Sequence, residues 1–385
     1  MEASSAVKTT VDYDVHGLCA VRLIGAGARE TAAVDRQLGP SRRELRAHAA
    51  EGPGSGEPDI TVRFVDRLEL SGPLRLIGLE DAAYTDDAFL VLRSKHKAQA
   101  RVVYDVATLG GPTEIVCERG LPAVPLLVAT INLTVLAGGT LPLHASAFEV
   151  GGRGVVTTGW SKGGKTEAML TFVTRGARFI GDEWVYVTGD GTRLYGLPEP
   201  IRLWDWHLAQ LPQLAAAAGS GTSARLRALR KAADAGAAVA RRTNGRGPAG
   251  GLALRASSLI RGQLHVDAAP ERLFGADALA LSGSFDRLFL VTSAQHDETV
   301  AEPIDPAEVA ARMAASLRHE RAPLIALYEK FRFAFPSARN EILETAAERE
   351  RELLGRVFDG KPAWEVRHPY PLQFAELHSA MAPHC

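Results

Sequence analysis

The stretch GVVTTGWSKGGKTEAMLTFVTRGARFIGDE, residues 154–183, decides the fold class that the sequence predicts. It begins with a β-branched run that is typical of a buried strand. A glycine-rich turn follows, and then an apolar segment at 165–174 that predicts a helix. A second strand is expected at 177–180, and it ends in an acidic pair. This order of strand, turn, helix and strand indicates an α/β fold.

The turn at 159–166 reads GWSKGGKT and fits the pattern G-x-x-x-x-G-K-[ST]. Glycines let successive backbone N–H groups point at one anion, and the helix that follows adds its positive N-terminal end. The lysine would reach the β- and γ-phosphates of a nucleotide, and the threonine hydroxyl would bind Mg²⁺. A glycine-rich turn without a ligand is the alternative. The residues expected to bind phosphate are Gly159, Ser161, Lys162, Gly163, Gly164, Lys165 and Thr166.

Lysine is scarce in this chain, since it supplies eight of the 44 basic residues. Two of the eight, Lys162 and Lys165, lie in the glycine-rich turn. A compact ammonium suits a site among phosphates better than the planar fork of arginine, so the choice of lysine at 165 favours a phosphate contact. Lys162 is either a second phosphate contact or a solvated loop residue.

An acidic pair follows the next predicted strand. Asp182 and Glu183 stand sixteen and seventeen residues after Thr166. In an α/β sheet the carboxyl ends of strands face the ligand crevice, so these acids should return beside the phosphates. The alternative is a surface acidic pair that opens a turn.

The segment 164–183 resembles the region from the phosphate loop to the acids in HPr kinase/phosphorylase and its relatives. Upstream, LHASA at 143–147 resembles the histidine-bearing strand of these kinases. Downstream, GLPEPIRL at 196–203 resembles their proline-containing strand. The resemblance covers 120–210 well, and 285–375 only in the order of elements. It implies a P-loop kinase domain with a mixed sheet and flanking helices, preceded by a β-rich N-terminal domain.

The same resemblance implies transfer of the γ-phosphate of ATP to a serine hydroxyl. Asp182 would take the hydroxyl proton, Lys165 would bind phosphate, and His144 would lie near the phosphates. The Mg²⁺ ligands would be Thr166 and Glu183, with Asp182 beside them. Without the resemblance, His144 reads as a buried structural histidine. Arg202 either reaches a phosphate or the acceptor, or it forms an interior salt bridge.

The turn departs from the family pattern at Trp160 and Lys162, and the second acid is a glutamate where the bifunctional enzymes have aspartate. The family's block after the acids, which is linked to phosphorolysis, has no clear counterpart, and this favours the kinase direction. The diverged turn and the basic insertion favour a specialised acceptor, which is a peptide, a small protein or a small metabolite. Two alternatives remain open. One is a distant phosphoenolpyruvate-carboxykinase-like enzyme, and the other is a non-catalytic ATP-binding regulator that signals through its basic insertion.

Two domains are predicted, a β-rich unit at 1–120 and the kinase-like unit at 121–385. The second contains an apolar, buried helix at 122–137 and a basic, low-complexity insertion at about 213–250, expected to be partly helical. The predicted strands of the first unit are 11–23, 59–64, 89–93, 101–106 and 114–118. Residues 38–58 are expected to hold a polar helical piece and then a GPGSGEP linker. The predicted C-terminal helices are 306–320, 323–333 and 338–357.

Composition narrows the function classes. With 46% hydrophobic and 23% charged residues, the chain reads as globular. A formal net charge of −1 argues against a nucleic-acid or membrane coat. Cys19, Cys117 and Cys385 form no ligand or disulfide pattern, so a cytoplasmic protein is expected. Whether it forms a homo-oligomer is left open.

Overall fold

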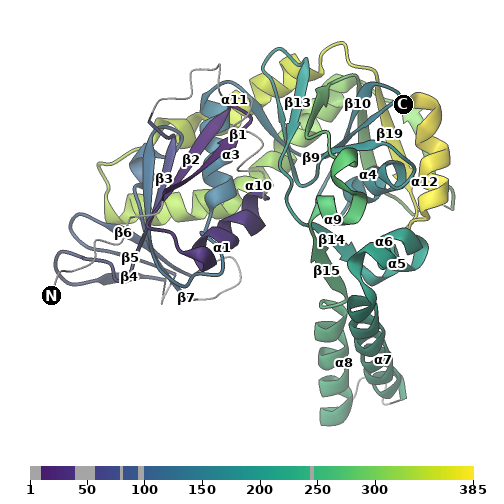
Figure 1. Cartoon of the computed structure of the whole chain (residues 1–385), viewed down its shortest axis with the longest axis horizontal. Helices are drawn as coiled ribbons and strands as arrows, with labels where there is room; N and C mark the ends of the chain where they lie inside the picture. The colour runs from purple at the N-terminus through teal and green to yellow at the C-terminus, as the bar shows by residue number, and fades with distance from the viewer. Residues whose placement is uncertain (1–9, 40–56, 79–80, 94–98, 243–246, 296) are drawn as a thin grey trace.

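The computed structural model describes residues 10–39, 57–78, 81–93, 99–242, 247–295 and 297–385. The chain is a mixed α/β protein with two mixed sheets, the first N-terminal to the second (Figure 1). Most of the segment 38–58, with its predicted helical piece and linker, lies outside the described residues.

The N-terminal sheet has eight strands in the order β1-β2-β3-β8-β7-β6-β5-β4. Its strands are β1 (Thr10–Val15), β2 (Cys19–Ile24), β3 (Ile60–Val65), β4 (Arg75–Ile77), β5 (Ala82–Tyr84), β6 (Phe89–Arg93), β7 (Gln99–Tyr104) and β8 (Thr113–Glu118). The prediction of one strand at 11–23 was wrong, because His16 and Gly17 adopt left-handed φ values of 56° and 69° and fold this run into a hairpin. Helix α1 (Ala28–Leu38) and strands β4 and β5 were not predicted.

The second sheet runs in the order β16-β13-β12-β9-β10-β17-β19-β18, and β11 also pairs with β9. Its strands are β9 (Leu141–Val150), β10 (Arg153–Thr158), β11 (Arg178–Gly181), β12 (Trp184–Val187), β13 (Arg193–Gly196), β16 (Ser282–Ser284), β17 (Arg287–Ser293), β18 (Val300–Pro303) and β19 (Ala363–His368). Strands β10, β17 and β19 are parallel to one another. Their carboxyl ends therefore meet at one edge of the sheet, and helix α4 (Lys165–Val173) begins there.

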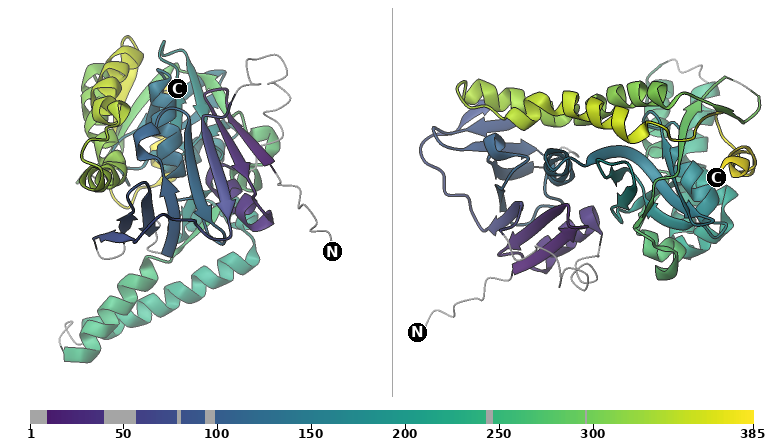
Figure 2. Two further views of the ribbon diagram at one scale, coloured as in Figure 1. Left: turned by 90° about the vertical axis from the view of Figure 1, so that its left-hand side faces the viewer. Right: turned by 90° about the horizontal axis from the view of Figure 1, so that it is seen from above.

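Three helices join the two sheets into one hydrophobic core. Helices α3 (Leu127–Ala137), α10 (Pro306–Ala334) and α11 (Glu341–Phe358) contribute to a buried cluster that also contains side chains of both sheets. In the right-hand view of Figure 2, α10 and α11 run side by side along both sheets. Among the helices of the described ranges, none has the length and apolar character needed to span a membrane.

Two helix predictions need correction. The predicted helices 306–320 and 323–333 are one helix, α10, with Pro323 inside it. Proline in a helix interior costs about 3 kcal/mol. Here the burial of Leu324 and Tyr328 in the turns after Pro323 offsets this cost, so the helix continues. Helix α3 begins at Leu127 and not at 122, after a segment with two prolines that restrict the residues before them.

The predicted insertion is a helical arm that projects from the second sheet (Figure 1). It stands on a separate two-stranded antiparallel sheet of β14 (Ile201–Trp204) and β15 (His265–Ala268). Its long helices are α7 (Ser220–Arg242) and α8 (Gly247–Arg261), so the partly helical prediction is confirmed for its described residues. Short helices flank it: α5 (Asp205–Gln210), α6 (Pro212–Ala218) and α9 (Pro270–Phe274). Helix α12 (Phe374–Met381) follows β19.

Asn340 connects the start of α11 to the segment between β7 and β8 of the N-terminal sheet. Its side-chain amide donates to the carbonyls of Val106 and Leu109 at 2.9 and 2.8 Å, and its oxygen accepts from the Leu343 N–H at 2.8 Å. Asn340→Ala removes this helix cap and leaves the buried carbonyls without hydrogen-bond donors. It should therefore lower the free energy of unfolding by about 2 to 4 kcal/mol in urea denaturation. Glu348→Ala, on the exposed side of the same helix, should change it by less than about 0.5 kcal/mol. Equal effects of the two variants would contradict this role of Asn340.

Candidate functional site

The glycine-rich loop, residues 159–166, joins β10 to α4 at the carboxyl edge of the parallel strands. Its backbone is left-handed at Gly159 and Gly164, with φ values of 148° and 107°. A Cβ atom on Gly159 would lie 2.4 Å from the carbonyl oxygen of Val291 in β17. A Cβ atom on Gly164 would lie 2.6 Å from Nε2 of His368 in β19. Both glycines are therefore required by the close packing of the loop against neighbouring strands.

Lys165 is buried at the start of α4, and its ammonium folds back over the glycine-rich loop. Nζ donates to the carbonyl oxygens of Trp160 at 3.1 Å and Gly159 at 3.4 Å. Burial lowers the pKa of Lys165, although the charges of Glu183 and Asp182 oppose this shift. The ammonium is thus held by two neutral carbonyl groups of the loop. An anion bound at the loop would be a stronger hydrogen-bond acceptor than either of them.

The side chains of Ser161 and Lys162, in the middle of the loop, make fewer contacts than that of Lys165. Lys162 is exposed and has a left-handed φ of 63°, and Ser161 is half-buried. Neither makes a hydrogen bond or ion pair with a residue in the described ranges. Both readings of Lys162 from the sequence remain open.

Asp182 is buried immediately after β11, with 3% of its surface exposed. The hydroxyl of Thr166 lies 3.0 and 3.1 Å from its two carboxylate oxygens, and the hydroxyl of Ser146 donates to the same group. Burial and the nearby charge of Glu183 raise the pKa of Asp182 to about 6. A carboxylate in this state can accept a proton near neutral pH.

A tight turn separates the two acids. Glu183 has a left-handed φ of 65°, and the N–H of Trp184 donates to the carbonyl of Asp182 at 2.8 Å across it. A non-glycine residue in this region costs on the order of 1–3 kcal/mol and is concentrated at functional sites. As a result the side chain of Asp182 points into the protein, whereas that of Glu183 is 54% exposed.

His144 lies on β9 between two carboxylates. Nε2 is 3.2 Å from Oε2 of Glu183, and Nδ1 is 3.1 Å from Oε1 of Glu320 in α10. The Nδ1 contact is an ion pair without the alignment of a hydrogen bond. Burial opposes the charged ring, but the two carboxylates outweigh it and raise the pKa of His144. The site therefore favours an imidazolium beside Lys165.

Two further histidines connect the glycine-rich loop to its surroundings. The ring nitrogens of His368 lie 2.9 Å from the Gly163 carbonyl and 2.8 Å from the Pro369 carbonyl, which ties the loop to the end of β19. His207 in α5 lies 3.0 Å from Glu167, the residue after Thr166. Burial opposes ionisation of Glu167, but the contact with His207 lowers its pKa.

Most of the predicted site residues are brought together. Lys165, Thr166, Asp182, Glu183 and His144 form one cluster at the carboxyl edge of β10 and β11. The three predicted metal ligands do not face one point, because Thr166 contacts Asp182 while Glu183 turns toward His144. Among the described residues, no group of three or more His, Cys, Asp or Glu side chains is arranged to hold a metal ion.

Three residues of the site were missed from the sequence: Ser146, Glu320 and His368. Ser146 follows His144 by two positions on β9, and period-two alternation would have placed both on one face of the strand. Glu320 and His368 reach the site only through tertiary packing. Arg202 pairs with Asp267 at 2.8 Å across the β14–β15 strand pair, so a salt bridge forms, but both side chains are exposed and the predicted interior location was wrong.

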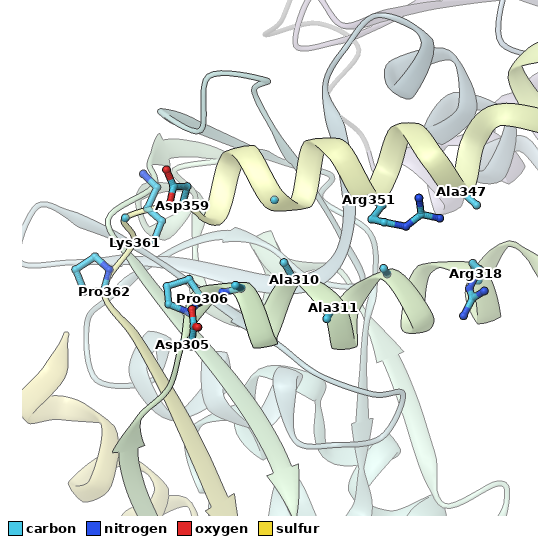
Figure 3. A pocket seen from close by; sticks show the side chains of 14 residues that line it. Asp305, Pro306, Ala310, Ala311, Arg318, Ala347, Arg351, Asp359, Lys361 and Pro362 are labelled. Atoms are coloured by element: carbon cyan, nitrogen blue, oxygen red, sulfur yellow. Dashed lines mark hydrogen bonds between the residues drawn. The ribbon is translucent and has the colours of Figure 1, made fainter.

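A cavity of about 790 Å³ lies between α10 and α11 (Figure 3). Alanines line its middle, and Lys361 and Pro362 line the end that Figure 3 draws beside Asp359. Lys361 and Pro362 precede β19, and the glycine-rich loop packs against the far end of that strand. This part of the cavity is therefore distant from the Asp182 cluster.

Glu320→Gln tests the His144 pair. Loss of one carboxylate should lower the pKa of His144, measured from its ring signals by NMR titration. Because the folded-state pKa lies above the ordinary value of 6.5, the pair stabilises the fold fully below that pH and loses its effect as pH rises through the folded-state pKa. The variant should therefore be destabilised more at about pH 6 than at about pH 9. Glu329→Gln, exposed on the same helix, serves as control, and an unchanged His144 titration in Glu320→Gln would refute the pairing.

Comparison with known proteins adds no relative: no family model and no curated protein matches this chain.

Proposed function

We propose that this protein is an ATP- and Mg²⁺-dependent kinase of the P-loop, HPr-kinase-like type. It would transfer the γ-phosphate to a hydroxyl, foremost a serine, of a peptide, a small protein or a small metabolite. The observation that carries the proposal is Asp182, a buried carboxylate with a pKa raised to about 6. It lies 3.0 Å from the hydroxyl of Thr166, directly behind a loop that reads GGKT.

The glycine-rich loop and Lys165 would hold the phosphates. Backbone N–H groups of a glycine-rich turn and the N-terminal end of α4 favour an anion. Lys165 would exchange its present carbonyl partners, Gly159 and Trp160, for phosphate oxygens. A charged partner forms a stronger hydrogen bond than a neutral carbonyl, so this exchange is favourable. His144 lies close by, and its raised pKa would favour a positive charge there.

The residues around Thr166 fit Mg²⁺. The Thr166 hydroxyl lies 3.0 Å from the Asp182 carboxylate, and Mg²⁺ prefers hard oxygen donors of these two kinds. Thr166 and Asp182 would supply two oxygen ligands, a hydroxyl and a carboxylate, while the carboxylate of Glu183 in the same turn faces His144. When bound, Mg²⁺ would neutralise charge on the phosphates, and most of its coordination would come from phosphate oxygens and water.

Asp182 would act as the base in the transfer. The acceptor O–H bond breaks and its proton passes to the Asp182 carboxylate. The acceptor oxygen bonds to the γ-phosphorus, while the bond from that phosphorus to the β,γ-bridging oxygen breaks and ADP leaves. With a pKa of about 6, Asp182 is mainly ionised at neutral pH and is still basic enough to accept the proton. Ser146 holds the carboxylate in place from the side of β9.

Lys165→Ala tests nucleotide binding. Loss of the ammonium from the loop should weaken ATP binding roughly 100-fold, measured by titration calorimetry with Mg-ATP. Lys330→Ala is the matched control, because that lysine pairs with Asp81 and lies outside the site. Equal ATP affinity in Lys165→Ala and wild type would refute a phosphate-binding role for the loop.

Asp182→Asn tests the transfer step. It keeps the shape of the side chain and removes the base, so ATP binding should persist while the rate of γ-phosphate transfer falls by about 10²- to 10⁴-fold. The measurement is labelling of an acceptor in an extract of the protein's host with γ-labelled ATP. Wild-type transfer should rise with increasing pH as Asp182 loses its proton.

Asp277→Asn, at an exposed position, controls for the substitution itself. Normal transfer by Asp182→Asn would overturn the assignment of the base. Tight ATP binding without transfer to any acceptor would favour the alternative of a nucleotide-sensing regulator, which needs no base beside the γ-phosphate.

A further inference from the structure

His368 is the last residue of β19, and its side chain lies against the glycine-rich loop. The side chain is buried, with 1% of its surface exposed. Nε2 lies 2.9 Å from the carbonyl oxygen of Gly163, and Nδ1 lies 2.8 Å from that of Pro369. The backbone of His368 is held as well, because its carbonyl accepts from the N–H of Ala294 at 2.8 Å. The ring therefore meets the loop from a fixed position.

The contact between His368 and Gly163 requires a hydrogen on Nε2. A carbonyl oxygen only accepts hydrogen bonds, so a bare Nε2 would set its lone pair against those of the oxygen. Two forms of the ring avoid this. One is the neutral ring with its hydrogen on Nε2, and the other is the ring with a hydrogen on each nitrogen. In both forms His368 donates a hydrogen bond to the loop.

Gly163 is held on both of its backbone groups. Its N–H donates to the carbonyl of Trp160 at 3.0 Å, and its carbonyl accepts from His368 at 2.9 Å. A Cβ atom on Gly163 would lie 2.9 Å from the carbonyl oxygen of Trp160 and 3.1 Å from that of Val291, so a larger residue does not fit. The phosphate-loop pattern leaves this position open to any residue, and glycine is required here by the packing of the loop.

The next N–H of the loop, that of Gly164, has no acceptor. The peptide between Gly163 and Gly164 is trans, so this N–H points in the direction opposite to the Gly163 carbonyl and thus away from His368. Gly164 is buried, yet no oxygen atom of the residues that the structure describes accepts from its N–H. A buried N–H without a partner is rare and costs free energy. An anion in the loop would supply the missing acceptor.

A flip of the peptide between Gly163 and Gly164 would exchange the directions of these two groups. Glycines stand on both sides of this peptide, and glycine adopts positive and negative φ values about equally, so the backbone itself opposes a flip only weakly. After a flip the Gly163 carbonyl would point where the N–H of Gly164 now points, and its partial negative charge would repel a phosphate. The hydrogen bond from His368 would be lost in the flipped state. His368 therefore favours the state that can bind an anion.

We propose that His368 is a positioning residue of the phosphate-binding loop, and that its hydrogen bond to Gly163 directs the N–H of Gly164 at a bound phosphate. The loop is then arranged for an anion before the ligand arrives, which lowers the cost of ordering it on binding. The inference rests on phosphate binding by the loop, which is part of the proposed function, and does not depend on the transfer step. The effect of His368 is therefore on the affinity for the phosphate chain.

Two substitutions separate the two ring nitrogens of His368. The amide nitrogen of glutamine can replace Nε2, whereas that of asparagine can replace only Nδ1, so His368→Gln keeps the donor to Gly163 and His368→Asn loses it. Binding of inorganic tripolyphosphate with Mg²⁺ to the full chain is measured by titration calorimetry. Affinity should fall roughly 10-fold in His368→Asn and stay within about 3-fold of wild type in His368→Gln. His384→Asn, at a half-buried histidine that stacks on Trp364 near the start of β19, should bind like wild type.

NMR spectra give a readout that a mere loss of packing would not change. In the wild type, Nε2 of His368 should carry a hydrogen, and the amide proton of Gly164 should shift downfield when tripolyphosphate binds. At saturating tripolyphosphate this shift should persist in His368→Gln and be absent in His368→Asn. A bare Nε2 or an unmoved Gly164 amide in the wild type would overturn the positioning role, even where a variant fails to fold. Equal affinity in His368→Asn and wild type, or equal losses in both variants, would overturn it as well.

The outcomes separate the role of His368 from the kinase function. Tripolyphosphate binding that depends on His368, in a protein that transfers no phosphate from ATP to any acceptor, would leave the positioning role standing and refute the kinase function. Phosphate transfer by a protein in which His368→Asn binds tripolyphosphate normally would do the reverse. If the wild type bound neither tripolyphosphate nor Mg-ATP, the loop would be no phosphate site, and both proposals would fail.

Discussion

The burial of the Asp182 carboxylate is the constraint on which the rest of the site depends. An ionised carboxylate without partners in a protein interior is strongly unfavourable. Two hydroxyls compensate for it, from Ser146 on β9 and Thr166 on α4. Strand β9, helix α4 and the turn after β11 must therefore meet at hydrogen-bond distance. The glycines at 159 and 164 make this possible, because they let the loop pack directly on β17 and β19.

The left-handed turn at Glu183 gives two adjacent acids different environments. Asp182 is enclosed, and both burial and the charge of its neighbour raise its pKa. Glu183 reaches the surface and shares His144 with Glu320. In enzymes, carboxylates whose pKa values are pushed apart by their surroundings commonly divide the roles of base and electrostatic partner. The strained backbone of Glu183 is the local cost of this division.

The parts of this structure that the sequence predicts are those specified by neighbouring residues. The β9–β10 hairpin, the glycine-rich loop, α4 and the return to Asp182 all lie within 45 residues, and turn chemistry and periodicity are sufficient to place them. The single helix α10 was mispredicted because a local rule, the break at Pro323, was outweighed by burial of side chains on both sides of it. The contact of Glu320 with His144 joins residues 176 positions apart, and no local pattern encodes it.

The continuity of α10 through Pro323 couples the N-terminal sheet to the site. On one side of the proline, Glu320 holds His144. On the other, Phe331 packs edge-on against Phe89 of β6, with ring centroids 5.6 Å apart. Since a helix transmits position along its length, the packing of the N-terminal sheet fixes where the Glu320 carboxylate stands relative to the imidazole. A kink at Pro323 would uncouple the two, so the burial that keeps α10 in one piece also maintains the charge state of His144 beside Lys165.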